Sequence, residues 1–100
     1  MRYAIAFDLD QSNLERTYPT PSYTNAYGDI KKFLETKGFA RQQGSVYFGD
    51  ETVDAVKAVI AIQKLSKKFP WFHPSITDIR LLRIEDDNDL LPAIESYLED

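Results

Sequence analysis

The order in which two kinds of hydrophobic periodicity alternate along this chain of 100 residues restricts its fold more than any other feature. Residues 2–9 alternate large apolar side chains with small or polar ones, the period of two that is typical of a strand. Residues 39–48 and 76–84 also have an extended pattern, and Gln43-Gly44 indicates a tight hairpin or a bulge between two short strands in the first of them. Helical periodicity separates these segments, so the predicted order is β-α-β-β-α-β.

Two helices are predicted between the strands. The first begins with Thr20 as its cap and Pro21 at its first position, and it ends at Gly38. Its repeating apolar positions are Tyr23, Ala26, Tyr27, Ile30, Phe33 and Leu34. The second has Asp50 as its cap and ends before Pro70. Its expected apolar surface consists of Val53, Val56, Val59 and Ile60, with Ala55, Ile62 and Leu65 around one side.

The remaining segments are read as connections and one further helix. Residues 11–21 are polar and contain two prolines, which predicts a loop, and residues 69–74 predict a structured aromatic loop. Asp87 or Asn88 is expected to cap a third helix over about residues 88–98. Its apolar stripe is Leu90, Leu91, Ile94 and Leu98.

This order predicts one α+β domain over residues 1–100, a ferredoxin-like sandwich with a core over about residues 2–86. Two helices should cover one face of a four-stranded antiparallel sheet and leave the other face open. On the first strand, Ile5 and Phe7 should face the helices, and Ala4, Ala6 and Asp8 the open side. Because small side chains let a second sheet approach closely, we expect the open face to form a homodimer.

The amino-acid composition indicates which cellular compartment and which kinds of partner to expect. It has no cysteine, no apolar stretch long enough for a membrane span and no apolar signal core, so we expect a cytoplasmic protein. The formal net charge of −4 argues against a nucleic-acid binder. Charge is unevenly distributed, however: residues 54–83 carry six basic and two acidic side chains, and residues 84–100 carry seven acidic and no basic ones. Nucleic acid therefore stays open as a partner, and the acidic C-terminal segment is a candidate competitor for the basic middle.

Asp8 is the most informative single residue. Strand interiors disfavour aspartate, and a buried charge is costly unless it is paired or metal-bound. Two interpretations remain: a carboxylate that hydrogen-bonds to the loop after the strand, or a metal ligand or proton acceptor. Residues 7–10, Phe-Asp-Leu-Asp, also resemble the start of haloacid-dehalogenase-type phosphatases, but Gln11 and Ser12 depart from that pattern and the chain is too short for such an enzyme.

Three segments together resemble the virulence-associated protein D (VapD) family. They are residues 3–9 (Tyr-Ala-Ile-Ala-Phe-Asp-Leu), residues 43–47 (Gln-Gly-Ser-Val-Tyr) and residues 78–85 (Asp-Ile-Arg-Leu-Leu-Arg-Ile-Glu), and the resemblance extends from Tyr3 to about Asp86. VapD proteins in turn resemble the small CRISPR-associated endonucleases, which are ferredoxin-like dimers. The resemblance implies an endoribonuclease that cleaves single-stranded RNA, toxin-like or growth-modulating, with a possible antitoxin protein as partner. A non-catalytic dimer that binds protein or nucleic acid through the open face is the alternative.

The resemblance also implies the site. Asp8 takes the place of the strand-one aspartate and Ser45 that of the serine, so two copies of Asp8 would face each other across a dimer interface and could hold one Mg²⁺ ion. Without metal, Asp8 or Tyr47 would accept the proton of the ribose 2′-hydroxyl, and Arg41 or Arg80 would stabilise the phosphorane. The candidate catalytic residues are therefore Asp8, Ser45 and Tyr47, and the candidate RNA-binding residues are Arg41, Gln43 and Arg80.

Several of these side chains also have purely structural interpretations. Ser45 fits turn chemistry, and a strand tyrosine such as Tyr47 is commonly packed. Arg80 and Arg83 lie on opposite faces of their strand, so one of them is expected to pair with the acidic tail instead of serving the open face. His73, the single histidine, lies beside a proline and is expected to be structural or exposed instead of catalytic. The lysines at the end of the second helix are explained by the helix dipole, with phosphate contact as the alternative.

Overall fold

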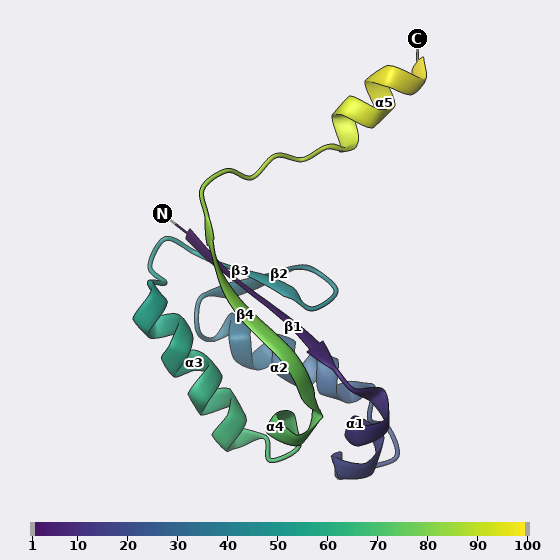
Figure 1. The fold of residues 1–100 in the computed structure, drawn as a ribbon, viewed down its shortest axis with the longest axis vertical. Coiled ribbons are helices and arrows are strands. Elements are labelled where there is room, and N and C mark those ends of the chain that lie inside the picture. Colours follow the sequence, from purple (N-terminus) through teal and green to yellow (C-terminus); the bar gives the residue numbers. More distant parts are fainter. Residues whose placement is uncertain (1, 100) are drawn as a thin grey trace.

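The computed structural model describes residues 2–99 and contains one four-stranded antiparallel sheet with helices packed on it. Its elements are β1 (Arg2–Leu9), α1 (Gln11–Thr17), α2 (Asn25–Glu35), β2 (Phe39–Gln43), β3 (Val46–Gly49), α3 (Ala55–Lys68), α4 (Phe72–Ser75), β4 (Ile76–Ile84) and α5 (Leu91–Glu99). The strands lie in the order β2-β3-β1-β4, so β1 is central and β4 forms one edge (Figure 1). The predicted ferredoxin-like α+β fold is confirmed.

The hairpin between β2 and β3 is also where the sequence predicts it. Gly44 has a φ of 43°, a left-handed conformation that glycine adopts without the steric cost of a Cβ atom. The pairing slips by one residue between Arg41 and Gln43, which places a bulge next to the turn. The Phe7 amide donates to the Ser45 carbonyl at 3.1 Å, and this bond ties the turn to the central strand.

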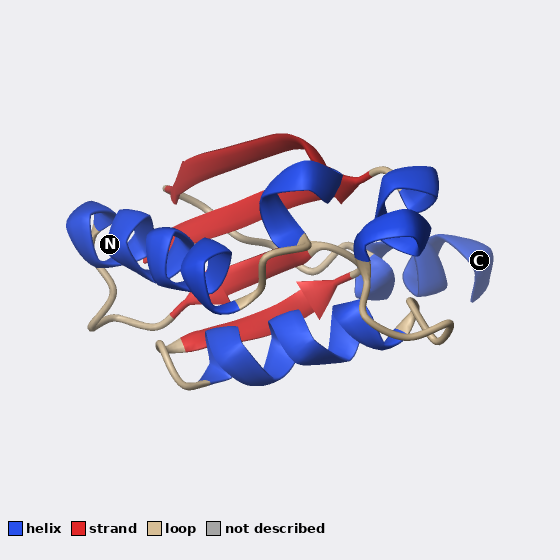
Figure 2. Ribbon diagram, turned by 90° about the horizontal axis from the view of Figure 1, so that it is seen from below, coloured by secondary structure: helices blue, strands red, loops and turns tan. Residues whose placement is uncertain are grey.

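The core lies between one face of the sheet and the helices, which are blue in Figure 2. Ile5 and Phe7 point into it as predicted, and the Phe7 ring stacks on Tyr47 with centroids 6.0 Å apart. From α2, the fully buried side chains are Ala26, Ile30 and Leu34. These positions agree with the predicted helical stripe.

The predicted apolar face of the second predicted helix, α3, is correct for Val53 and Leu65, which are buried, and wrong for its other main positions. Val56, Val59 and Ile60 are 67%, 51% and 41% exposed, and the buried side chains of this helix are Ala58, Ala61 and Leu65. The physical reason lies in the neighbours of the helix: the core already contains the bulky rings of Phe7, Tyr47, Trp71 and Phe72. A helix that meets these rings packs closely through alanines, and its branched residues remain outside.

The expected loop over residues 11–21 is also wrong in its first part, which forms α1. Asp10 caps this helix, because its side chain accepts from the Asn13 amide at 2.9 Å. Leu14 is fully buried and supplies the tertiary contact that a helix of seven residues needs. Residues 18–21 lie outside the helices as predicted, but the predicted helix start at Thr20 and Pro21 is wrong, because α2 begins at Asn25, after Thr24.

Other helix boundaries differ as well. Asp54, not Asp50, caps α3 by accepting from the Lys57 amide at 2.8 Å, and Asp50 instead accepts from the amide and hydroxyl of Thr52. The aromatic loop contains the start of the short helix α4, whose Phe72 is buried in the core.

The C-terminal helix α5 projects away from the rest of the molecule (Figure 1). The amide of Leu91, its first residue, donates to an Asp89 carboxylate oxygen at 2.9 Å, and not to Asp87 or Asn88, which the sequence predicts as the cap. None of the described residues of α5 is buried. Within residues 2–99, no helix is long and apolar enough to cross a membrane.

Candidate active site

Asp8 lies near the end of β1 and is exposed on the sheet face that the helices leave open. The ladder with β4 changes register directly after it, because Asp8 pairs with Asp78 and Leu9 pairs with Ile76. Thr77 is the extra residue of this bulge, and its hydroxyl donates to the Asp8 carbonyl oxygen at 3.3 Å. Bulges of this kind often aim a side chain beside an active site. The structure therefore presents the Asp8 carboxylate to solvent at a locally irregular point of the central strand.

The strand register brings two more predicted residues to the same face. Gln43 pairs with Val46, Val46 with Ala6, and Ala6 with Arg80. Residues that are paired across neighbouring strands share a face, so Gln43 and Arg80 lie at the two ends of one row. Asp8 belongs to the next row of this open face.

Arg80 is held in place by a residue that the sequence analysis missed. The Arg80 Nε donates to both carboxylate oxygens of Asp78, at 3.1 and 3.2 Å. Within residues 2–99, the two terminal NH₂ groups of this guanidinium make no hydrogen bond or ion pair. Asp78 could have been found from the antiparallel register, because Asp8 and Asp78 are direct cross-strand partners. Two carboxylates and one guanidinium thus occupy adjacent positions of the open face.

Tyr47 and Arg41 lie on the other face. Tyr47 pairs with Ile5, is 2% exposed and belongs to the core, and Arg41 is its partner on β2. Burial raises the pKa of the Tyr47 phenol, although the charge of Arg41 opposes the rise. The expectation that these two side chains join Asp8 in one site is not supported by the fold, because the sheet separates them from Asp8.

Ser45 occupies the turn between β2 and β3 and is half-buried. Its carbonyl is the acceptor for the Phe7 amide, so its backbone lies beside the residue that precedes Asp8. This contact is a structural role that the turn interpretation predicts. The structure places Ser45 near the end of β1 and shows no side-chain bond between it and Asp8.

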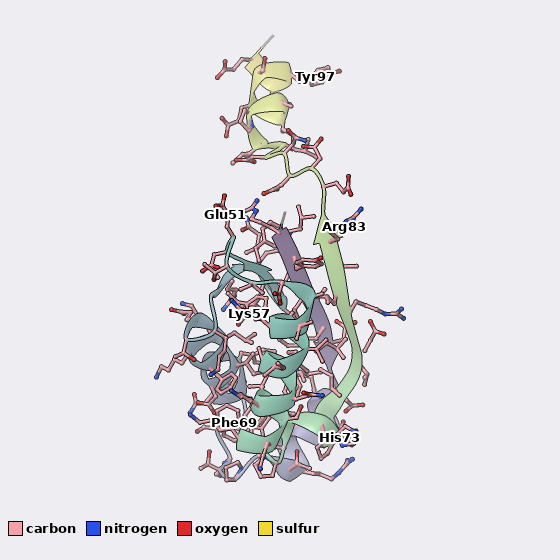
Figure 3. The ribbon with its side chains drawn as sticks, turned by 90° about the vertical axis from the view of Figure 1, so that its left-hand side faces the viewer. Glu51, Lys57, Phe69, His73, Arg83 and Tyr97 are labelled. Carbon is pink, nitrogen blue, oxygen red and sulfur yellow. The ribbon has the colours of Figure 1, made fainter. Side chains whose placement is uncertain are left out.

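The contacts of Arg83 and the position of His73 agree with their structural interpretations. Arg83 forms an ion pair with Glu85, at the start of the acidic segment, as the opposite parity of Arg80 and Arg83 predicts. His73 is exposed in α4, just before the start of β4 (Figure 3).

Asp8 and Asp78 are the carboxylates of the open face that would hold a magnesium ion. Among residues 2–99 there is no group of three or more histidine, cysteine or carboxylate side chains that could hold a metal. Mg²⁺ commonly binds through one or two carboxylates together with waters and substrate phosphate oxygens, and Asp8 with its cross-strand partner Asp78 would offer donors of this kind. Asp78 is shared with Arg80, which leaves Asp8 as the main candidate ligand.

Comparisons with known proteins identify a broad family and, within it, a narrower group of similar proteins. Residues 1–90 match the family model described as CRISPR associated protein Cas2. The chain is 51% identical to Endoribonuclease VapD 2 of Riemerella anatipestifer over 92% of this chain and 98% of that protein. It is 48% identical to an Endoribonuclease VapD homolog of Helicobacter pylori, over 96% of this chain and 99% of that one. It is also 40% identical to Endoribonuclease VapD of Dichelobacter nodosus, over 93% and 97%. The chain therefore belongs to the VapD family, within the wider family that the Cas2 model describes.

Proposed function

We propose that this chain is an endoribonuclease that cleaves single-stranded RNA and that Asp8 is its central catalytic residue. The observation that carries the proposal is the exposed carboxylate of Asp8 at the bulged end of the central strand, with Arg80 on the same face. The names of the VapD relatives support the reaction class. Within residues 2–99, the exposed Asp8 carboxylate forms no hydrogen bond or ion pair, so it contributes little to stability and is better explained by function.

In the metal-free route, Asp8 accepts the proton of a ribose 2′-hydroxyl as the 2′-oxygen bonds to the adjacent phosphorus. The bond from phosphorus to the 5′-oxygen breaks, and water supplies the proton that this leaving oxygen needs. The free NH₂ groups of Arg80 stabilise the negative charge that develops on the phosphoryl oxygens, and Gln43 contacts the strand at the other end of the row. Tyr47 is unsuited to the role of base, since it is buried and its pKa is raised.

In the metal-dependent route, Asp8 would be a ligand of Mg²⁺. The bound ion would supply polarisation of a phosphoryl oxygen and activation of a water molecule. Asp78 orients Arg80 in either route, because its carboxylate engages Nε and turns the other NH₂ groups outward. Removal of divalent cations separates the two routes.

The open face is proposed as the interface of a homodimer. Ala4 and Ala6 are small and central, and Leu82, the partner of Ala4, is 50% exposed. A two-fold axis beside β1 would bring two copies of Asp8 to one site. A toxin-like action on cellular RNA, held in check by an antitoxin protein, is the proposed setting.

The apolar side chains of this face also suit a second function, a non-catalytic dimer that binds protein or nucleic acid. Phe48 and Leu82 flank Ala4 and give the face an apolar centre that a binding surface needs. Cleavage separates the two functions, because an adaptor leaves RNA intact.

The test uses the purified full-length chain and a fluorescently labelled single-stranded RNA, with Mg²⁺ or with EDTA. The wild type should release fragments, and Asp8→Asn should not. Loss of cleavage in EDTA assigns the metal-dependent route, and cleavage that persists assigns the metal-free route. Intact RNA under all conditions would overturn the nuclease proposal and favour the adaptor.

A further inference from the structure

A belt of lysines surrounds the junction of α2 and α3, on the side of the sheet opposite Asp8. Two hollows adjoin there and share Lys37. The larger has a volume of about 560 Å³ and is lined in part by Lys32, Phe33, Lys37, Lys68 and Phe69. The smaller has a volume of about 190 Å³ and is lined by Lys37, Lys57, Ile60, Ala61 and Lys64. The lysine belt is defined as Lys32, Lys37, Lys57, Lys64 and Lys68.

Two of these ammonium groups converge on one aromatic ring. The Lys37 Nζ lies 5.5 Å from the Phe33 centroid, and the Lys68 Nζ lies 5.6 Å from the same centroid and 5.7 Å from that of Phe69. Each cation is attracted to the ring, and the two together concentrate positive charge on this aromatic surface. An anion bound at this surface would be stabilised by both.

No carboxylate of residues 2–99 supplies this anion, because none lies within ion-pair distance of the five lysines. Asp29 lines the larger hollow and accepts from the Tyr18 hydroxyl at 2.6 Å, so this hollow has one carboxylate beside the three lysines Lys32, Lys37 and Lys68. Lys31, which lies outside both hollows, is by contrast paired with Glu35 at 3.8 Å.

The helix dipole explains only part of the belt. Lys68 is in the last turn of α3, where a cation is favourable. Lys57 is in the first turn of the same helix, where the dipole disfavours a cation, and its Nζ donates to the Thr52 carbonyl at 3.0 Å. Lys57 is partly compensated by Asp50, because its charge helps to lower the pKa of that carboxyl group. The other four lysines of the belt form the cationic surface that suits an extended polyanion.

We propose that the lysine belt binds the sugar-phosphate backbone of an RNA strand outside the cleavage site. This inference rests on the proposed ribonuclease function. A basic groove with aromatic rings is the usual surface for single-stranded nucleic acid, and the half-buried rings of Phe33 and Phe69 lie beside the charges.

The lysine belt can bind the same RNA strand that Asp8 cleaves. The end of the belt at Lys68 lies close to the end of the sheet that carries Asp8. Phe69 and His73 are at the same end of the molecule (Figure 3), and Ile76, which soon follows, pairs with Leu9. A strand that leaves Asp8 reaches Lys68 by passing around this end. Loss of the belt should therefore raise KM and leave kcat nearly unchanged.

The test measures binding of a labelled 20-nucleotide oligouridine by fluorescence anisotropy at several KCl concentrations, in an Asp8→Asn background that prevents cleavage. The variant is Lys37→Gln with Lys68→Gln. The matched control is Lys31→Gln with Lys67→Gln, which removes the same charge from the same part of the chain without touching either hollow. Loss of two phosphate contacts should weaken binding about 5-fold to 20-fold and reduce the slope of log K against log salt by about 1.4, and the control should stay within about twofold of the parent.

Equal effects of the two double variants, or an unchanged salt slope, would overturn the proposal. Displacement of the oligouridine by polyglutamate of equal total charge would also overturn it, because the belt would then be a surface for acidic protein. The cleavage assay separates this result from the parent proposal. If the wild type cleaves RNA but the belt variant keeps its KM and salt slope, the belt fails alone; if the wild type does not cleave but the belt variant loses binding, the nuclease function fails alone.

Discussion

At the scale of single residues, the chemistry of this protein depends on which face of the sheet a side chain occupies. Asp8 and Arg80 share the open face, and Arg83 lies on the opposite face beside Glu85. Both arginines are exposed and each is paired with one carboxylate, so their intrinsic properties are similar. Any difference between Arg80 and Arg83 in their effect on the cleavage rate must therefore come from the face of the sheet that each occupies.

We expect Arg80→Gln to lower kcat about 10-fold to 100-fold, because the developing phosphorane charge loses its guanidinium. Arg83→Gln is the matched control and should change kcat less than twofold. Steady-state cleavage of labelled RNA measures both, and thermal melting checks that each variant is folded. Equal kcat values for the two variants would contradict the placement of the site.

Tyr18 gives a prediction about pH. Its hydroxyl donates to Asp29 at 2.6 Å, and this hydrogen bond, burial and the charge of Asp29 together raise the pKa of Tyr18 from 10.0 to about 12. Because the pKa is raised on folding, the bond stabilises the fold fully below pH 10, and this contribution is lost as pH rises through 12. Tyr18→Phe should lower the free energy of unfolding by about 1 kcal/mol at pH 8.

Urea unfolding at pH 8 to 12 checks this prediction. The difference between the wild type and Tyr18→Phe should shrink above pH 10. Tyr97→Phe, at a position that is 79% exposed, is the control and should match the wild type throughout. A difference that stays constant up to pH 12 would show that the hydrogen bond does not control the ionisation of Tyr18.

At the scale of elements, α3 determines how tightly the core closes. It meets the sheet through Ala58, Ala61 and Leu65, and it turns Val56 to solvent. A helix with small residues on its inner side packs close to its neighbours, and a single large residue there then has a disproportionate effect.

Leu65→Ala should destabilise the fold by about 2–5 kcal/mol, because the side chain is fully buried and its removal leaves a cavity. Val56→Ala should cost less than about 0.5 kcal/mol, since this side chain is 67% exposed. Chemical denaturation of the two variants tests which face of α3 is inside. The reverse order of the two effects would place Val56 inside the core and Leu65 at the surface.

Some of these elements could be predicted from the sequence, and others could not. The strands were predictable because a period of two and a glycine turn are local signals, and the strand parity correctly separated Arg80 from Arg83. The face of α3 was not predictable, because it depends on aromatic rings that arrive from distant segments. The helix α1 was missed because its stability comes from the Asp10 cap and the burial of Leu14. Within the candidate site, Tyr47 was assigned without its burial and Asp78 was overlooked without the register of β1 and β4.

At the scale of the whole molecule, charge and apolar surface are segregated. The described molecule extends 51 × 31 × 20 Å, and α5 forms its projecting end (Figure 1). Acidic residues of the C-terminal segment meet the body through Arg2 and Asp87, at 3.3 Å, and through Arg83 and Glu85. Residues 2–99 leave the open face of the sheet uncovered, which is the physical basis for the proposed dimer.

Size-exclusion chromatography with light scattering should give twice the mass of 11.5 kDa for the wild type. Leu82→Asp should give a monomer, because it places a charge at the centre of the open face. Val56→Asp introduces the same charge at an exposed apolar position of α3 and should remain a dimer. A monomeric wild type would exclude the shared site.

The most direct test of the central claim compares two aspartates that are two residues apart. Asp8→Asn removes the proposed catalytic carboxylate, and Asp10→Asn makes the same chemical change at the cap of α1, where asparagine is an equally good capping residue. We expect the single-turnover rate of RNA cleavage to fall at least 100-fold for Asp8→Asn and less than about threefold for Asp10→Asn, with both variants melting near the wild-type temperature. Cleavage by Asp8→Asn at the wild-type rate, or an equal loss in both variants, would contradict the claim.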